Sequence, residues 1–352
     1  MAVDLADGDS IGKAAVMLHK SLNPLIIVGS GANTDAVRLA LMAFWEATEI
    51  PFVVMAQAKG AMDEFSRDYL GSVAYEKNDY IHCSLAYADL IINVGHSPDE
   101  LPSMAGLKEG AKIIHFLQSA SSVNDDEVNH SVLGNIAANI KILTNIVKVS
   151  RDWRFSYFYN MKNKQTLGIN ERSSDNSSPV SACYAAFEMR ERLGDSDVLV
   201  VDHALYEKCF IREYRSYQRN TLLVEKVKGG GLALLIFSSL LFSDKKVALI
   251  CDEEAFMAGR ECFDIAKSLD LLIVVLVLGP DNSSIDNSSL VEEVNKLGVQ
   301  YYTPKDGEGF KRDTYKAKCG DGMQVVIADT DKAAYLDMEK ALVGTPCDCA
   351  ED

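Results

Sequence analysis

Short apolar stretches that alternate with helical segments are the feature that most constrains the fold of this chain. The first such stretch is Leu25-Ile26-Ile27-Val28, which is followed by Gly29-Ser30-Gly31 and then by a periodic run at 37–47. This order predicts a strand, a glycine turn and a helix. Parallel strands need crossover connections, and the helices then cover both faces of the sheet. We therefore expect an α/β protein built on doubly wound parallel sheets.

The same alternation recurs along the chain and predicts two domains in tandem. A chain of 352 residues is long for a single core, so two domains of ordinary size are expected. In the first half, further strands are expected at 51–55, 88–94 and 111–117, and helices at 11–22, 79–87 and 135–149. In the second half, strands are expected at 198–201, 246–250, 271–278 and 323–327, and helices at 180–192, 231–242, 260–268 and 290–297. We place the domains at 1–150 and 180–345, with a linker at 151–179 and a tail at 346–352.

The charge balance excludes two classes of partner. The chain has 35 basic and 51 acidic residues, a net charge of −16, and no stretch gathers the positive charge into a patch. Nucleic acid and anionic membranes are therefore poor partners. The apolar runs at 232–242 and 271–278 are shorter than the roughly 20 residues that cross a bilayer. Met1–Ser10 has neither a signal-peptide nor a transit-peptide pattern, so we expect a soluble protein without membrane insertion.

The eight cysteines are scattered through expected core elements without the spacing of a disulfide framework. This pattern predicts reduced thiols and an intracellular location, either cytoplasm or organelle matrix. Cys347 and Cys349 form the one close pair, near the end of the chain. A metal or redox role and an inert, frayed tail both remain open for this pair.

Several stretches of the first 150 residues resemble, in order, the middle domain of thiamine-diphosphate-dependent enzymes of the acetolactate synthase type. They are NPLIIVGSGA at 23–32, KGAMDE at 59–64, YLG at 69–71, ADLIINVG at 88–95, KIIH at 112–115 and VLG at 132–134. The second half resembles the diphosphate-binding domain of the same enzymes, at 197–202, 229–231, 246–256 and 272–278. The resemblance implies a Rossmann-like middle domain followed by a thiamine-diphosphate-type domain.

At the cofactor site that this resemblance implies, the sequence departs from the family pattern. In the family, a Gly-Asp-Gly turn supplies a carboxylate to Mg²⁺, and an Asn-Asn pair completes the site of the metal that bridges the diphosphate. Aligned on Phe256, the turn reads Asp252-Glu253-Glu254 here, and the Asn pair falls on Gly279-Pro280. Asp281 and Asn282 lie two residues further on. We therefore expect that thiamine diphosphate and magnesium do not bind.

The acidic turn has two remaining interpretations. Asp252 and Glu253 are weak candidates for binding a cation by themselves. A short acidic run also suits a solvated helix start, where it complements the helix dipole.

Glycine turns supply the other candidate cofactor contacts. Gly29, Ser30, Gly31 and Ala32 stand between a strand and a helix, where backbone N–H groups can meet an anion, and Gly95 ends another strand. Some members of the family bind FAD or an adenine nucleotide near such turns, but the glycines equally suit a tight strand end. By the same resemblance, Gly229 and Gly231 are candidate contacts in the second domain.

Other polar residues give weaker signals. The segment at 115–118, HFLQ, lacks the carboxylate expected at an adenosine-contacting position, which argues against tight FAD binding. The six histidines have no metal-ligand spacing, and His96 suits either a polar contact at a strand end or a surface loop. No Ser-His-Asp or Cys-His arrangement is evident, so we nominate no catalytic residue.

These observations lead to three functional hypotheses. The first is a non-catalytic relative of acetolactate-synthase-like enzymes, used as a structural or regulatory subunit with protein partners or as a homo-oligomer. The second is a thiamine-diphosphate-dependent 2-oxo acid decarboxylase or carboligase subunit. It would need a separate aminopyrimidine-binding domain, because the family's first domain has no counterpart in this sequence. The third is a module that binds an adenine nucleotide or CoA.

Overall fold

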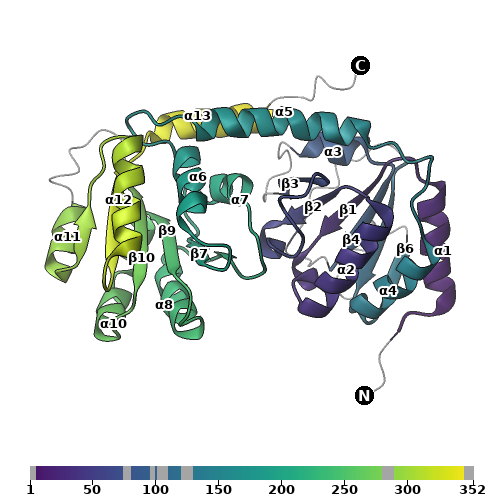
Figure 1. The fold of residues 1–352 in the computed structure, drawn as a ribbon, viewed down its shortest axis with the longest axis horizontal. Helices are drawn as coiled ribbons and strands as arrows, with labels where there is room; N and C mark the ends of the chain where they lie inside the picture. Colours follow the sequence, from purple (N-terminus) through teal and green to yellow (C-terminus); the bar gives the residue numbers. More distant parts are fainter. Residues whose placement is uncertain are drawn as a thin grey trace. The chain divides into compact units, whose positions relative to one another are not determined.

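The computed structural model describes residues 5–73, 81–95, 100, 110–119, 130–279 and 289–344. These residues form two compact units, each with its own parallel sheet (Figure 1). The first unit comprises residues up to Thr166 together with those from Leu342, and the second comprises Leu167–Ala341. The expected α/β class with two tandem doubly wound sheets is therefore confirmed.

The first sheet has six parallel strands in the order β3-β2-β1-β4-β5-β6. Its strands are β1 (Pro24–Val28), β2 (Phe52–Met55), β3 (Tyr69–Val73), β4 (Leu90–Val94), β5 (Lys112–Leu117) and β6 (His130–Leu133). Its helices are α1 (Gly8–Lys20), α2 (Asp35–Thr48), α3 (His82–Tyr87) and α4 (Ile136–Ile146), with short 3-10 turns η1 (Ser30–Ala32) and η2 (Ala56–Ala58). Since β1, β2, β4 and β5 pair on both sides, their side chains are almost entirely apolar.

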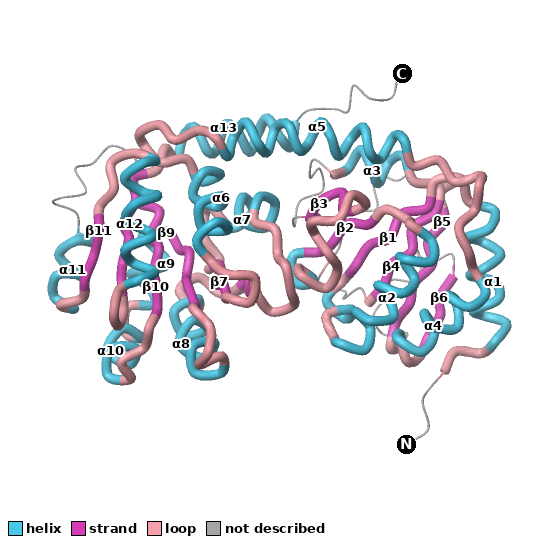
Figure 2. The backbone as a smooth tube through the Cα atoms, in the orientation of Figure 1, coloured by secondary structure: helices cyan, strands magenta, loops and turns pink. Residues whose placement is uncertain are grey.

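The second sheet also has six parallel strands, in the order β11-β12-β10-β9-β7-β8. Its strands are β7 (Val198–Val201), β8 (Leu222–Val224), β9 (Val247–Asp252), β10 (Ile273–Gly279), β11 (Gln300–Tyr302) and β12 (Gln324–Asp329). Its helices are α6 (Ala182–Arg192), α7 (Glu207–Glu213), α8 (Gly231–Leu241), α9 (Glu253–Gly259), α10 (Cys262–Ser268), α11 (Ser289–Leu297), α12 (Gly307–Cys319) and α13 (Lys332–Gly344). Figure 2 shows these strands flanked by helices.

The pleat of the second sheet divides its apolar side chains between two faces. Val247, Leu249 and Cys251 of β9 alternate along the strand and belong to one core cluster with Leu235 of α8 and Phe263 of α10. The intervening side chains of the same strand are also buried, because the sheet is covered on both faces. This packing fixes the register of β9 and with it the position of Asp252 at the end of the strand.

The segment expected to be a linker contains a long helix, α5 (Ser156–Ser173). Sequence periodicity did not predict it, because the helix is polar and lacks a clear apolar face. The division between the two units falls within this helix, between Thr166 and Leu167.

Cys83 is disulfide-bonded, which corrects the expectation that all thiols are reduced. The remaining described cysteines, Cys183, Cys209, Cys251, Cys262 and Cys319, are free. Cys347 and Cys349 lie outside the described residues. Among the helices in the described ranges, none combines the length and apolar character needed to cross a membrane.

Candidate functional site

Each sheet has a point where the strand order reverses, and the candidate residues gather at these two points. In the first sheet the reversal lies between β1 and β4, and in the second it lies between β7 and β9. The carboxyl ends of the strands on either side of such a point usually open a crevice that binds ligands. Gly29–Ala32 and Gly95 stand at the first point, while Asp202 and Asp252 stand at the second.

The two glycine turns of the first domain are in direct backbone contact. The N–H of Gly31 donates to the carbonyl of Gly95 over 2.7 Å, and Gly95 has a φ of +67°. A Cβ atom on Gly31 would lie 2.8 Å from the oxygen of Gly95, and a Cβ on Gly95 would clash with the backbone nitrogen of Ala32. Both glycines are thus required by the close approach of two strand ends, whether or not a ligand binds there.

The carboxylate of Glu100 accepts hydrogen bonds from the same turn. The N–H of Ser30 donates to its two oxygens over 3.1 and 2.9 Å, and Glu100 is only 3% exposed. A backbone N–H at the start of a helical turn is the group that a phosphate would use. In this chain that group is already bonded to an internal anion.

Asp202 plays the corresponding part in the second domain. This residue directly follows β7, and its carboxylate accepts from the N–H of Gly229 over 2.9 Å and from the N–H of Gly231 over 2.7 Å. Gly231 is the first residue of α8, so the carboxylate satisfies N–H groups that a helix start leaves without an intrahelical acceptor. Asp202 is 1% exposed, and burial raises the pKa of its carboxyl group, while the two glycine hydrogen bonds act in the opposite direction.

Asp252 uses both of its carboxylate oxygens within the protein. One accepts from the N–H of Ala255 over 2.8 Å and thereby caps α9, and the other accepts from the N–H of Leu205 over 3.1 Å. The expected helix-start role is therefore present. These bonds also occupy the backbone N–H groups of Leu205 and Ala255.

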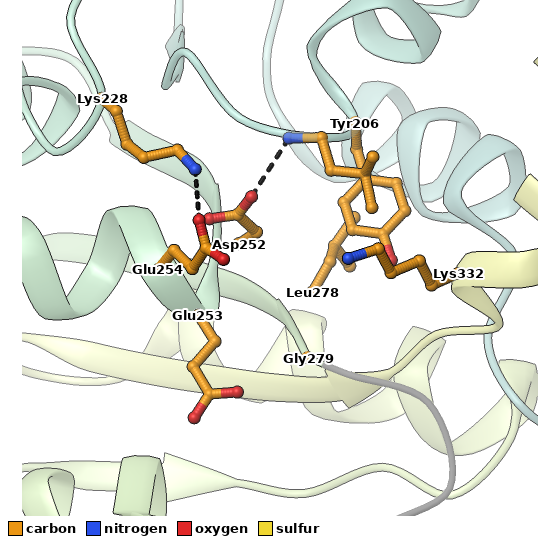
Figure 3. Close-up of a pocket in the computed structure, with 9 residues that line it drawn as sticks. Tyr206, Lys228, Asp252, Glu253, Glu254, Leu278, Gly279 and Lys332 are labelled. Carbon is orange, nitrogen blue, oxygen red and sulfur yellow. Dashed lines mark hydrogen bonds and ion pairs between the residues drawn. The ribbon is translucent and has the colours of Figure 1, made fainter. Parts of the chain in front are cut away.

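A pocket of about 280 Å³ opens at the carboxyl ends of β9 and β10 (Figure 3). This volume is close to the lower end of the range for small-molecule sites. The pocket mixes acidic, basic and apolar side chains from several elements, namely Leu205, Tyr206, Lys228, Asp252, Glu253, Glu254, Leu278, Gly279 and Lys332.

The acidic turn does not converge on one point. Lys228 lies 2.5 Å from Glu254, and this contact raises the pKa of the lysine and lowers that of the glutamate. Figure 3 shows Glu254 directed at Lys228, Asp252 directed at the neighbouring backbone and Glu253 extending another way. No group of three or more metal-ligating His, Cys, Asp or Glu side chains occurs in the described ranges.

The positions aligned with the family's Asn pair are only partly described. Gly279 ends β10 and has no side chain, although a Cβ there would be 3.5 Å from the nearest atom, the carbonyl oxygen of Ala328. Pro280, Asp281 and Asn282 lie outside the described residues, as does His96.

Sequence reasoning did not identify Glu100, Asp202, Lys228 or Lys332 as site residues. For Asp202 a signal existed, because an acidic residue directly follows a predicted buried strand at 198–201. Glu100 and Lys332 stand in polar stretches, so their positions depend on the tertiary fold alone.

Comparison with known proteins gives a consistent result. Residues 11–143 match the family described as thiamine pyrophosphate enzyme, central domain. A candidate thiamine pyrophosphate-containing protein of Bacillus subtilis is 22% identical over 338 residues, which cover 91% of this chain and 55% of that protein. Oxalyl-CoA decarboxylase of Escherichia coli is 25% identical over 282 residues, which cover 76% of this chain and 48% of that protein. Acetolactate synthase of Mycobacterium bovis is 23% identical over 276 residues, which cover 73% of this chain and 42% of that protein.

The fold has a counterpart among solved structures. A candidate thiamin diphosphate-dependent enzyme isolated from Mycobacterium smegmatis superposes with a TM-score of 0.73 at 14% identity, covering 94% of this chain and 66% of that one. The chain spans about half the length of the curated relatives it matches.

Proposed function

This chain is a relative of the thiamine-pyrophosphate-dependent enzymes, and on that premise we propose that it is a non-catalytic member that keeps the fold without the cofactor. The observation that supports this proposal most directly is the bonding of Asp252. Its carboxylate, which lines the pocket, accepts from the N–H groups of Leu205 and Ala255, and a diphosphate is bound through backbone donors of this kind.

Electrostatics supports the same proposal. Asp252, Glu253 and Glu254 line one pocket, where the family pattern has a single carboxylate between two glycines. Of the two basic residues that line it, Lys228 is paired with Glu254. Additional carboxylates next to a diphosphate repel it, and the repulsion is strongest where the pocket is partly shielded from water.

The role that remains is that of a structural or regulatory subunit. Its retained domains would then serve for assembly with other proteins or with further copies of the chain. Isothermal titration with thiamine diphosphate and Mg²⁺ tests the proposal. We expect no heat of binding at micromolar to low millimolar ligand, and a micromolar dissociation constant would refute it.

A second candidate function is that of a catalytic decarboxylase or carboligase subunit. It is favoured by relatives whose names are oxalyl-CoA decarboxylase and acetolactate synthase. For this function, an aminopyrimidine-binding domain would have to act together with the two domains described here. Purification of the native complex, followed by a pyruvate-consumption assay with thiamine diphosphate, separates the two proposals: turnover supports the catalytic subunit, and its absence supports the first.

The third hypothesis, a module that binds an adenine nucleotide or CoA, is disfavoured by Glu100. The carboxylate of this residue already accepts hydrogen bonds from the N–H of Ser30. Thermal shift against ADP, FAD and CoA tests it directly. A ligand at 100 times its Kd would stabilise the protein by about 2.7 kcal/mol. We expect no such shift in the unmodified chain.

A further inference from the structure

Three sulfur atoms from three helices meet in the interior of the second domain. The Sγ of Cys183 on α6 lies 3.4 Å from the Sγ of Cys209 on α7 and 3.6 Å from the Sδ of Met338 on α13. Both cysteines are buried, while Met338 is partly exposed. We call these three residues the sulfur cluster. All of them belong to the second unit, so the cluster is formed within one domain.

Helix α13 faces both cysteines of the sulfur cluster. Helices α6 and α7 pack against each other and lie side by side in Figure 1. Tyr335 precedes Met338 by one turn on the same face of α13, and its ring meets that of Tyr206 at the start of α7, with centroids 4.8 Å apart. Burial raises the pKa of the Tyr335 hydroxyl, and the nearby Cys209 thiol raises it further. The face of α13 that carries Met338 therefore covers both thiols.

The spacing of the sulfur atoms is close to that of a metal site. Metal–sulfur bonds of about 2.3 Å place the ligands of a trigonal site about 4.0 Å apart. The observed separations of 3.4 and 3.6 Å need to widen by roughly half an ångström to reach this geometry. A methionine side chain is unbranched and adapts easily, so small rotations can supply this change.

Two thiols and a thioether form a soft set of ligands. Thiolate and thioether sulfur select monovalent copper, whereas Mg²⁺, Ca²⁺ and Mn²⁺ prefer oxygen ligands. Structural Zn²⁺ sites also use thiolates, but they have four ligands drawn from Cys, His and carboxylates. The thioether of Met338 in contact with Cys183 therefore favours Cu(I) over Zn²⁺.

Charged side chains next to the sulfur cluster distinguish it from ordinary apolar packing. Burial raises the pKa of the Cys209 thiol well above its usual value, and Arg212 acts in the opposite direction by favouring the thiolate that a metal requires. Glu213 accepts a hydrogen bond from the Sγ of Cys183 over 3.8 Å, and its side chain is 1% exposed. Its second oxygen, Oε2, has no hydrogen-bond partner among the described residues. An incompletely bonded ionic group is costly to bury, and hydrophobic packing alone does not need one.

We propose that Cys183, Cys209 and Met338 form a binding site for a Cu(I) ion. The ion forms bonds to both thiolate sulfurs and to the thioether sulfur. Both S–H bonds break, and their protons are released to solvent. No electron is transferred, because copper enters and remains as Cu(I). None of the three residues lines the pocket at the carboxyl ends of β9 and β10, so the proposal does not depend on the loss of the cofactor.

Anaerobic titration of the reduced full chain with Cu(I), in competition with bicinchoninate, tests this site. We expect a single tightly bound ion, with thiolate-to-copper charge-transfer absorption in the ultraviolet. X-ray absorption at the copper edge should show three sulfur neighbours at about 2.3 Å. Met338→Leu keeps the volume of the side chain, so it should remain folded. It should lose one sulfur neighbour and weaken Cu(I) binding about tenfold or more.

Cys251→Ala is the matched control, because Cys251 is a free, buried cysteine of the second domain outside the sulfur cluster. This variant should bind Cu(I) as the unmodified chain does. Cys183→Ala and Cys209→Ala should each weaken binding about 100-fold or more, with far-UV circular dichroism showing that they remain folded. The double variant Cys347→Ser, Cys349→Ser should keep the affinity, because the tail pair is not part of the site.

Thermal unfolding gives a second readout. Cu(I) should raise the Tm of the unmodified chain and of Cys251→Ala, but not that of Cys183→Ala. A chain that does not compete with bicinchoninate for Cu(I) would overturn the proposal. So would an affinity that both Cys183→Ala and Cys209→Ala retain, because copper would then bind elsewhere. Binding of Zn²⁺ as tightly as Cu(I) would also overturn it, because the site would not select a soft ion.

Discussion

The ammonium group of Lys59 lies 2.7 Å from the carboxylate of Glu64, and both side chains are completely buried. Each partner also makes a further hydrogen bond. Lys59 donates to the hydroxyl of Ser72 over 2.9 Å, and Glu64 accepts from the N–H of Gly60 over 2.7 Å. Tyr69 and Ser72 share a further hydrogen bond of 2.7 Å. This network joins the turn after η2 to β3, at the edge of the first sheet.

Replacing one partner of this ion pair should destabilise the first domain strongly. Lys59→Met leaves the carboxylate of Glu64 buried without compensation, which we expect to cost about 3–5 kcal/mol. The double variant Lys59→Met, Glu64→Gln should lose less, because the amide still accepts from Gly60. Both tryptophans, Trp45 and Trp153, belong to the first domain, so their fluorescence during urea unfolding reports on this domain. A loss below about 1 kcal/mol for the single variant would contradict the prediction.

Gly95→Ala should destabilise the first domain through two separate effects. It places a side chain on a residue with a φ of +67°, and its Cβ would collide with the backbone at Ala32. Together these effects should cost roughly 2–5 kcal/mol in the same fluorescence assay. Gly110→Ala isolates the backbone effect, because Gly110 has a φ of +81° with no atom within 4 Å of the added Cβ. Equal losses of unfolding free energy for the two variants would show that the structure adjusts to remove the collision between the Cβ of residue 95 and the backbone at Ala32.

The stability of the second domain should depend on pH through Asp202. Because burial raises the pKa of this carboxyl group, the folded state holds the proton more tightly than the unfolded state. Stability relative to Asp202→Asn should therefore fall as pH rises from 3.8 through the raised pKa. Hydrogen exchange of α8 in the two proteins at a series of pH values measures the difference. A relative stability that rises with pH over this range would contradict a raised pKa for Asp202.

Restoring the family's glycines should reopen the pocket to diphosphate. The variant Asp252→Gly, Glu253→Asp, Glu254→Gly removes two carboxylates and frees the N–H groups of Leu205 and Ala255. We expect affinity for Mg²⁺-pyrophosphate to rise at least about tenfold, which corresponds to 1.4 kcal/mol of relieved repulsion. Isothermal titration measures it, with Lys228→Gln as a control that changes pocket charge without freeing these donors. An unchanged affinity would mean that other features exclude the diphosphate.

The sequence predicted the centre of each sheet better than its edges. The strands β1, β2, β4, β5, β7, β9, β10 and β12 follow from apolar runs, because strands with neighbours on both sides are buried on both faces. The four strands that were not predicted are β3, β6, β8 and β11, and each is at an edge. These strands are short or partly polar, as HSVL at 130–133 and QYY at 300–302 illustrate. Edge strands of this kind have little periodicity to detect.

The sequence predicted where the candidate site lies but not the hydrogen bonds within it. Glycine turns after strands located both crevices, because this position is a property of local sequence in parallel sheets. The residues that bond to those turns come from elsewhere in the chain, as Glu100 does for Ser30 across 70 positions. Pairings at such separations are set by tertiary packing, so a single sequence does not reveal them.

The carboxylates of Glu100 and Asp202 bind backbone N–H groups of their own chain and so act as intramolecular ligands. A tethered group competes at a high effective concentration and is not lost on dilution, unlike a coenzyme that must be captured from solution. Under the proposed loss of the cofactor, folding of both crevices would not depend on thiamine supply, and the protein should accumulate equally in thiamine-starved and thiamine-replete cells. Under the same proposal, an anionic cofactor could use these backbone N–H groups only after displacing the two carboxylates.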